Sequence, residues 1–334
     1  MNILVTGAAG FIGYSFIKSI LNNNYNIVGL DNINDYYDVE LKYARLSDIG
    51  IQKTEEYGNI INSTLYKNVK FVREDICNKE FLIKLFDEFK FDIVINLAAQ
   101  AGVRDSERLI DSYLDSNVIG FVNLLECCKL HNIKRFIYAS SSSVYGNCKN
   151  LPFNIYDSTE QPISLYACTK KFNELTAYTY SYLHNIQTVG LRFFTVYGPW
   201  GRPDMAIFKF VKNIISGNCI DIYNYGDMYR DFTYIDDVCS CIKYLLNGEL
   251  TFDYNIPYAI YNIGTGCCTG ILDIISIIEN KLHIRANKNL IEKQTCDVHK
   301  TCAEISKPFD KLQFINCKDG ISKFIDWYKL YYKI

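Results

Sequence analysis

The chain has 334 residues, of which 49% are hydrophobic, 15% aromatic and 22% charged, and its net charge is −2 with a pI near 6.1. This length and composition predict an ordered globular α/β protein, built as one large unit or as a large unit with a smaller lobe. The balanced charge, without a run of five basic residues, argues against nucleic acid or an anionic membrane as a partner.

The N-terminus reaches its first glycine at Gly7 without a positively charged leader, so we interpret it as a strand and expect a cytoplasmic protein. No apolar run approaches the ~20 residues that a membrane span needs. The 13 cysteines form no Cys-x-x-Cys pair, and the four histidines do not cluster with them. We therefore expect neither a disulfide framework nor a metal site, and interpret the cysteines as small buried residues in a reducing compartment.

Residues 3–6 form an apolar strand that leads into a glycine turn over 7–13 and then into a helix with apolar residues at helical spacing. Glycines let the backbone turn tightly and let a pyrophosphate approach the helix N-terminus. The next strand, 27–30, ends in Asp31, eighteen residues past Gly13. A carboxylate there accepts hydrogen bonds from an adenosine ribose and repels a 2′-phosphate, so the pattern predicts NAD rather than NADP.

Residues 32–68 are mostly polar, and we interpret them as a surface insertion with one short helix. The strand that follows ends near Asp75, which meets either the adenine amino group or only solvent at a turn. After a helix over 79–89, the strand 92–97 leads into small residues, which allow a flat cofactor ring to approach the backbone closely.

Arg104 follows these small residues and is either a contact for a phosphate or carboxylate of the substrate or an exposed arginine without a specific role. A long helix over 112–131 carries apolar residues on more than one face, which suggests burial against both the sheet and a partner. The strand 136–139 then runs into four consecutive serines, 140–143. Their hydroxyls lie at the C-terminal end of a strand, where open α/β sheets bind ligands.

Tyr166 and Lys170 begin the next helix, and their spacing of four residues places the phenol and the ammonium on one face. A free tyrosine ionises near pH ~10, and a neighbouring cation lowers that pKa toward the range of a useful general base. The same spacing occurs at Tyr14/Lys18, where no serine-ended strand precedes the helix. On spacing alone a solvated helix pair remains open, whereas the context favours a catalytic pair.

The strand 188–193 opens into a loop over 194–203 that is rich in Gly, Pro and aromatic residues, where we expect a second lobe to begin. Further on, Arg230 is a candidate ligand for a diphosphate. Asp236 and Asp237 precede an apolar helical stretch, and we interpret them as helix N-terminal acids rather than as catalytic groups.

Long strings of the chain match a known family. These strings include 7–13, 31–32, 34–38, 97–104, 139–146, 164–167, 169–171, 191–205, 223–226 and 230–237. The chain resembles the extended short-chain dehydrogenase/reductases that act on nucleotide sugars, and most closely the UDP-glucuronate 4-epimerases. The resemblance runs from residue 1 to about 265 and thins after Cys267.

The resemblance implies a Rossmann-like, doubly wound parallel sheet over 1–195, with return segments near 232–265, and a smaller α/β substrate-binding lobe over 196–334. It implies a homodimer held by a four-helix bundle. It also implies a tightly held NAD, which takes a hydride from C4 of UDP-glucuronate and returns it to the other face of the 4-keto sugar. A UDP-glucuronate decarboxylase and a UDP-glucose/UDP-galactose 4-epimerase remain as alternatives within the fold.

The resemblance also assigns roles to single residues. Ser141, Tyr166 and Lys170 would be catalytic. The residues expected to bind NAD are Gly7, Gly10, Phe11, Ile12, Gly13, Asp31, Asn32, Asp75, Ile76, Leu97, Ala98, Ala99, Gln100, Ser140, Tyr166, Lys170, Phe193 and Val196. Those expected to bind the UDP-sugar are Arg104, Ser141, Ser142, Ser143, Thr195, Arg202, Tyr223, Arg230 and Asp297, with Ser142, Ser143, Thr195 and Arg202 on the carboxylate.

Two departures from the family pattern stand out. Related dehydratases carry an Asp-Glu pair where this chain has Ser142-Ser143, so the acid that expels a 6-hydroxyl is missing and dehydration is disfavoured. Cys296-Asp297 stands where the family has Gly-Asp, which affects the loop expected to contact the substrate ribose.

Overall fold

The computed structural model describes residues 1–248, 250, 252, 255–294 and 297–334. The chain divides into two compact units. The first comprises residues 1–146, 158–192 and 242–261, and the second comprises 147–157, 193–241 and 262–334. The main segment of the second unit begins near the predicted boundary at 195/196, and the assignment of domains to these segments stays a prediction.

Within the described residues, a sheet of eight strands in the order β11-β7-β6-β5-β1-β2-β4-β3 forms the centre of the first unit. Its strands are β1 (Asn2–Thr6), β2 (Asn26–Asp31), β3 (Ile60–Asn62), β4 (Val69–Arg73), β5 (Ile93–Asn96), β6 (Arg135–Ser141), β7 (Gln187–Phe193) and β11 (Tyr258–Ile263). β1 pairs in parallel with both β2 and β5, β2 pairs in parallel with β4, and β5 with β6, while the edge strand β3 is antiparallel. The predicted doubly wound α/β fold is confirmed.

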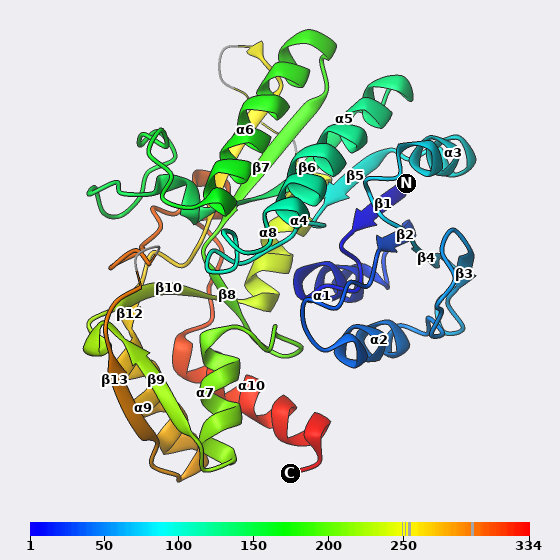
Figure 1. Cartoon of the computed structure of the whole chain (residues 1–334). Coiled ribbons are helices and arrows are strands. Elements are labelled where there is room, and N and C mark those ends of the chain that lie inside the picture. The colour runs from blue at the N-terminus through cyan, green and yellow to red at the C-terminus, as the bar shows by residue number, and fades with distance from the viewer. Residues whose placement is uncertain (249, 251, 253–254, 295–296) are drawn as a thin grey trace. The chain divides into compact units, whose positions relative to one another are not determined.

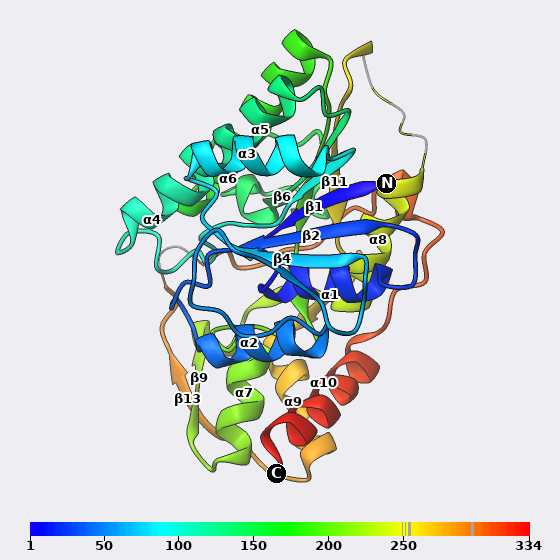
Figure 2. The same cartoon turned by 90° about the vertical axis from the view of Figure 1, so that its right-hand side faces the viewer.

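Helices cover both faces of this sheet: Figure 2 shows α3, α5 and α6 on one face and α1 and α2 on the other. Their bounds are α1 (Phe11–Ile20), α2 (Val39–Asp48), α3 (Lys79–Phe89), α4 (Ile110–Leu114), the π-helix η1 (Asp115–Ile119), α5 (Gly120–Leu130), the 3₁₀ turn η2 (Ser142–Tyr145), α6 (Leu165–His184) and α8 (Ile235–Asn247). Apolar residues of α3 and α5 pack with those of β1, β2 and β5 in one buried cluster. Burial of such side chains is the main favourable contribution to folding.

Two elements of the first unit differ from the sequence-based expectation. The helix predicted over 112–131 is interrupted, because α4 passes through the π-helix η1 before α5 begins. A π-turn accommodates one extra residue within a helix and frequently occurs at functional sites. The strand predicted to end at 139 continues to Ser141, so Ser140 and Ser141 belong to β6 itself.

The second unit contains shorter sheets, in which β10 pairs with β8 and β12, and β9 with β13. Its strands and helices are β8 (Thr195–Tyr197), α7 (Ala206–Ile215), β9 (Cys219–Tyr223), η3 (Asn224–Gly226), β10 (Tyr229–Tyr234), β12 (Cys268–Gly270), α9 (Ile271–Leu282), β13 (Asn287–Ile291), η5 (Lys307–Phe309) and α10 (Cys317–Tyr332). Figure 1 shows β9 and β13 side by side with α9 behind them. Asp236 and Asp237 lie in the first turn of α8, as predicted.

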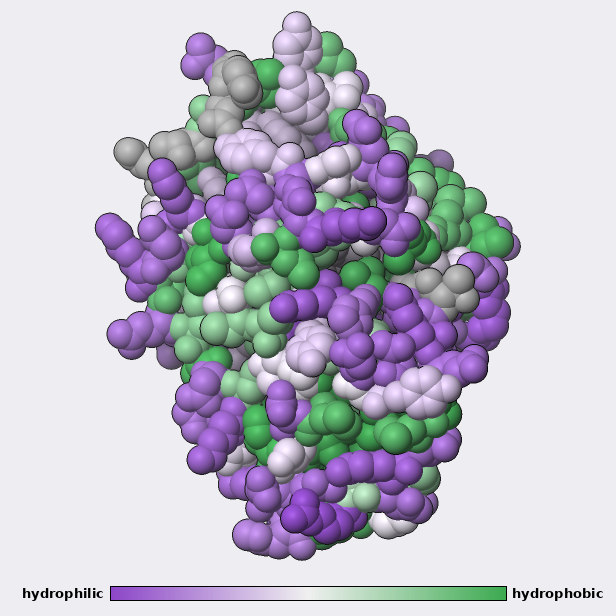
Figure 3. Space-filling view, turned by 90° about the vertical axis from the view of Figure 1, so that its left-hand side faces the viewer, coloured by the Kyte–Doolittle hydropathy of each residue, from purple (hydrophilic) through white to green (hydrophobic). Residues whose placement is uncertain are grey.

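Among the helices of the described residues, none combines the length and the hydropathy that crossing a bilayer requires. The described residues contain no group of three or more His, Cys, Asp or Glu side chains placed to hold a metal ion. Figure 3 shows one face of the molecule, on which hydrophilic and hydrophobic residues are intermingled.

Candidate active site

The glycine turn after β1 packs directly on the backbone that follows β5. Gly7 has φ +69°, and a Cβ atom there would lie 2.7 Å from backbone atoms of Leu97 and Ala98. A Cβ at Gly13 would collide with the carbonyl oxygen of Gly7. Only glycine satisfies both the backbone conformation and this close approach, so the turn and the end of β5 form one surface. In the order of the sheet, β1 and β5 are neighbours at the topological switch point, where open α/β sheets bind nucleotides.

The helix α1 begins at this turn, and no side chain caps its N-terminus. Gly10 is the N-cap residue with φ −74° and ψ 169°. The first N–H groups of a helix lack partners within the helix and carry partial positive charge, so they bind anions. This terminus suits the diphosphate that the sequence predicts.

Asp31, at the end of β2, binds the glycine turn through its carboxylate. Its Oδ2 accepts the N–H of Ala9 at 3.0 Å, and its Oδ1 accepts the N–H of Ile33 at 2.8 Å. The Ala9 carbonyl in turn accepts Nη1 of Arg45 at 2.9 Å. Each carboxylate oxygen can accept two hydrogen bonds, so Asp31 retains capacity for ribose hydroxyls. The sequence prediction missed this structural role of Asp31 and the contribution of Arg45.

Asp75 also makes local hydrogen bonds. Its Oδ2 accepts Nδ2 of Asn32 at 2.8 Å, and its Oδ1 accepts the N–H of Cys77 at 2.8 Å. The two predicted adenosine-binding residues Asn32 and Asp75 are therefore brought together. Ile76, the other residue predicted nearby, is 4% exposed and packs in the core.

Gln100, which follows β5, is held by a buried asparagine that the sequence analysis did not single out. Asn117 lies within the π-helix η1, and its amide accepts the N–H of Gln100 at 2.9 Å and donates to its carbonyl at 3.0 Å. The same amide donates to Thr169 of α6 at 3.1 Å. No local pattern singled out Asn117, because Asp115 and Ser116 beside it are polar as well.

The side-chain nitrogen Nε2 of Gln100 is buried and has no hydrogen-bond partner among the described residues. A buried amide nitrogen without a partner carries a desolvation cost unless a ligand supplies an acceptor. Together with the uncapped N-terminus of α1, this orphaned group fits a bound NAD at the C-terminal ends of β1 and β5.

The predicted catalytic residues converge at the end of β6. Lys170 Nζ donates to the Ala139 carbonyl at 2.9 Å and lies 5.9 Å from the centre of the Tyr166 ring. Ser141, two residues after Ala139, accepts the N–H of Ser143 on its Oγ at 3.1 Å. Tyr113 of α4 packs edge-on against Tyr166, with 6.1 Å between the ring centres. The structure thus places Tyr166 and Lys170 of α6 beside the strand that carries Ser141.

Lys170 is only 3% exposed. Burial lowers the pKa of its ammonium from 10.5 to about 8, because the charged form loses its hydration. A desolvated cation interacts more strongly with a nearby negative charge, since water no longer screens it. Lys170 is therefore suited to stabilise the anionic form of a neighbouring phenol.

The serines at the end of β6 have different environments. Ser140 is 2% exposed and donates its hydroxyl to Glu174, so its side chain is committed to the protein. The Ser143 hydroxyl is buried and has no hydrogen-bond partner among the described residues. The Ser143 hydroxyl is therefore available to a ligand. Ser140 can contribute to cofactor binding only through its backbone groups.

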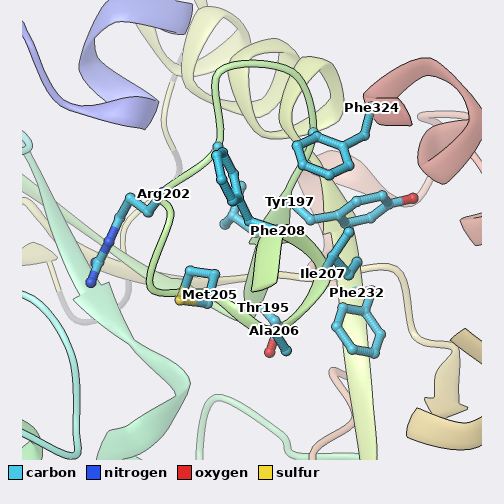
Figure 4. A pocket seen from close by; sticks show the side chains of 12 residues that line it. Thr195, Tyr197, Arg202, Met205, Ala206, Ile207, Phe208, Phe232 and Phe324 are labelled. Atoms are coloured by element: carbon cyan, nitrogen blue, oxygen red, sulfur yellow. The ribbon is translucent and has the colours of Figure 1, made fainter. Parts of the chain in front are cut away.

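In the second unit, Thr195, Val196 and Arg202 line one pocket with Met205, Phe208 and Phe232. Figure 4 shows the aromatic side chains on one side of this pocket and Arg202 on the other. Arg202 forms a bidentate ion pair, in which Nε and Nη2 donate to the Asp204 carboxylate at 3.0 and 2.6 Å. The sequence analysis named Arg202 but missed Asp204, although the two are only two residues apart.

The remaining predicted ligand residues are spread over several elements. Tyr223 ends β9, and Arg230 of β10 donates to the carbonyls of Tyr229 and His299. Phe193, at the end of β7, is 7% exposed. The N–H of Asp297 donates to the Gln294 carbonyl, and Cys296 lies outside the described residues. Arg104, in the first unit, is exposed.

Comparison with known proteins relates the whole chain to nucleotide-sugar enzymes. Residues 3–264 match the NAD dependent epimerase/dehydratase family. The chain is 44% identical to Protein CapI of Staphylococcus aureus over 348 residues, which covers all of both chains. It is 42% identical to UDP-glucuronate 4-epimerase 4 of Arabidopsis thaliana, over 99% of this chain and 76% of that protein. A solved structure of UDP-glucuronic acid 4-epimerase from Bacillus cereus, in complex with UDP-glucuronic acid and NAD, aligns with a TM-score of 0.87 and 34% identity over 99% of this chain and 100% of that chain.

Proposed function

The chain belongs to the NAD dependent epimerase/dehydratase family, and on this premise we propose that it interconverts UDP-glucuronate and UDP-galacturonate by epimerisation at C4. The observation that carries the proposal is the arrangement at the end of β6. There Lys170 is held against the Ala139 carbonyl, one helical turn from Tyr166 and beside Ser141. Relatedness to UDP-glucuronate 4-epimerases over 99–100% of this chain supports the choice of sugar.

The proposed chemistry is a proton transfer at the 4-hydroxyl coupled to a hydride transfer at C4. Ser141 and Tyr166 hydrogen-bond the 4-hydroxyl, and Tyr166 removes its proton as the general base. Before this transfer Lys170 stabilises Tyr166 as the phenolate by its desolvated charge, and the proton that it takes up leaves Tyr166 as the neutral phenol. Bound NAD supplies the hydride acceptor at C4 and then the hydride donor. The 4-keto sugar turns over in the site, and Tyr166 returns the proton to the inverted alcohol.

For the sugar carboxylate we propose hydrogen bonds from Ser142, Ser143 and Thr195 and an ion pair with Arg202. The orphaned Ser143 hydroxyl supports this assignment. Asp204 accepts hydrogen bonds from Nε and Nη2 of Arg202, which fixes the plane of the guanidinium. The 4-keto intermediate is a β-keto acid, so a carboxylate held at a fixed angle protects it from loss of CO₂.

We also propose that the protein is a homodimer in the cytoplasm. Apolar side chains are exposed on neighbouring α4, η1 and α6, namely Ile110, Leu114, Ile119, Leu175, Tyr182 and Leu183. Two helices from each subunit would bury this face in a four-helix bundle. The cysteines of the described residues are all free. A monomer mass by light scattering at micromolar concentration would contradict the dimer.

One incubation tests the proposed reaction. The purified protein is mixed with UDP-glucuronate without added cofactor, and the products are identified by proton NMR. We expect UDP-galacturonate, with NAD retained by the protein. A UDP-pentose as the main product would make the protein a decarboxylase, and turnover of UDP-glucose but not UDP-glucuronate would make it a UDP-glucose/UDP-galactose 4-epimerase.

A further inference from the structure

A network of buried polar side chains adjoins the candidate catalytic residues. Its members are Ser140, Tyr145, Glu174 and Arg192, each no more than 4% exposed. Glu174 Oε1 accepts the Ser140 hydroxyl at 2.6 Å and Arg192 Nε at 2.9 Å, and Oε2 accepts Arg192 Nη2 at 2.9 Å. Arg192 Nη1 donates to the Tyr145 hydroxyl at 2.9 Å, and the guanidinium lies over the Tyr145 ring.

This network joins the elements that carry the catalytic groups. Ser140 precedes Ser141 on β6 and follows Ala139, which accepts the Lys170 ammonium. Glu174 lies on α6, four residues after Lys170 and eight after Tyr166, which is the spacing of one helix face. Tyr145 ends the turn η2 that contains Ser142 and Ser143. Through Arg192, at the end of β7, the network therefore links the serine turn, β6 and α6.

The Glu174–Arg192 ion pair is better suited to fixing the positions of neighbouring side chains than to stabilising the fold. A buried ion pair often contributes no more net stability than apolar side chains that fill the same volume, because both charges lose their hydration. A bidentate guanidinium–carboxylate pair does, however, fix distance and orientation. Burial alone would lower the pKa of Arg192, but the hydrogen bond and the charge of Glu174 raise it, so the guanidinium stays charged.

We propose that Glu174 and Arg192 are positioning residues for hydride transfer, which hold Ser141 and the serine turn at a fixed distance from Tyr166 and Lys170. This inference rests on the proposed 4-epimerase function for the identity of the reaction. Neither side chain touches the substrate in this scheme. Loosening the pair misplaces the reacting groups by a fraction of an ångström, which lowers the rate of the chemical step while the binding groups remain in place.

The test replaces the pair by a neutral one, Glu174→Met with Arg192→Met, so that no unpaired charge stays buried. A second variant, Arg192→Lys, keeps the cation but cannot bind both Glu174 oxygens and Tyr145 at once. The matched control is Glu279→Gln on α9 of the second unit, where a carboxylate that is 3% exposed pairs with Arg285 and Lys288.

Steady-state kinetics on UDP-glucuronate and the NAD content of the full-length holoenzyme are measured for each variant. We expect the neutral pair to lower kcat at least tenfold, with KM and NAD content within about twofold of wild type. Glu279→Gln should leave kcat within about twofold. A kcat near wild type in the neutral variant would overturn the proposal, as would a loss of kcat matched by an equal loss of NAD and of folded protein.

Hydrogen–deuterium exchange of the holoenzyme supplies a readout that needs no substrate. The amides of Ser142–Gly146 should exchange at least tenfold faster in the neutral variant and in Arg192→Lys, while those of α9 do not change. Unchanged exchange in this turn would overturn the positioning role. This readout does not depend on the sugar. A wild-type protein that is inactive on UDP-glucuronate would therefore refute the proposed function, and hydrogen–deuterium exchange alone would then decide the positioning role. If the neutral variant does not fold, Arg192→Lys decides by both readouts.

Discussion

Replacing Lys170 with methionine should abolish turnover and at the same time stabilise the cofactor-free protein at neutral pH. Burial lowers the pKa of Lys170 from 10.5 to about 8. By linkage, this lowering means that the charged ammonium destabilises the folded protein by about 3 kcal/mol. Methionine removes the charge but also loses the hydrogen bond to the Ala139 carbonyl, which contributes about 1 kcal/mol. We therefore expect a net gain of about 2 kcal/mol in the free energy of unfolding at pH 7.

The pH dependence of this gain follows from the sign of the shift. The folded-state pKa of Lys170 lies below the unfolded value, so below about pH 8 both states are protonated and the destabilisation is fully present. Between about 8 and 10.5 the folded protein loses its proton first, and the wild-type protein becomes more stable as pH rises. Across this window the stability that Lys170→Met gains over wild type should decrease. Above the window the variant should be less stable than wild type by about 1 kcal/mol, because the lost hydrogen bond to Ala139 is then the only difference.

Urea titrations of the cofactor-free proteins at neutral pH and near the top of this window measure the difference. Cofactor must be removed, because a ligand that binds only the folded state adds its own stabilisation. Lys84→Met, an exposed lysine on α3, is the matched control and should change stability by less than about 0.5 kcal/mol. A Lys170→Met protein that is less stable than wild type at pH 7, or a difference that does not vary with pH, would refute the reasoning.

Three further substitutions test the candidate site. Tyr166→Phe should lower turnover at least about 100-fold and leave NAD content and circular dichroism unchanged, because it removes only the ionisable oxygen; turnover within tenfold of wild type would contradict the base assignment. Asp31→Asn should weaken both the retention of NAD and the preference of the protein for NAD over NADP by roughly tenfold. The reason is that the amide lacks the negative charge and has only one acceptor oxygen for the N–H groups of Ala9 and Ile33. An unchanged preference in competition binding would make Asp31 purely structural. Arg202→Ala should lower turnover of UDP-glucuronate roughly tenfold more than turnover of UDP-glucose, measured in parallel assays. Equal losses on both sugars would remove the carboxylate role.

The local pattern of the sequence was sufficient to predict the strands β1, β2, β4, β5, β6, β7 and β9, the glycine turn and the helix α6, but not β3, β8, β10, β12 and β13. Apolar periodicity identified β1, β2 and α3, and the positions of Gly7 and Asp31 identified the nucleotide end of the sheet. The spacing of four residues alone would not have distinguished Tyr166/Lys170 from Tyr14/Lys18. Lys18 donates to the Tyr14 hydroxyl at 3.2 Å in α1, but both bind Asp48, so the pair is structural. The serine-ended strand before Tyr166 was the feature that discriminated.

Contacts between distant segments could not be predicted from one sequence. Asn117 and Gln100 are seventeen residues apart, and Glu174 and Arg192 eighteen, and no periodicity relates the members of either pair. Both pairs depend on how helices dock on the ends of strands. The interruption of the predicted helix over 112–131 has the same origin, because Asn117 in η1 binds Gln100 and Thr169 on other elements.

The Glu174–Arg192 pair explains why the Lys170 ammonium does not pair with Glu174. Glu174 lies four residues after Lys170 on α6, the spacing at which lysine and glutamate side chains commonly pair on a helix. Arg192 instead takes both oxygens of Glu174, and Lys170 donates to the uncharged carbonyl of Ala139. A Lys170–Glu174 pair would neutralise the ammonium and weaken its effect on the Tyr166 phenol. By occupying Glu174, Arg192 leaves a desolvated cation beside Tyr166, and the destabilisation that accompanies this cation is what Lys170→Met should relieve.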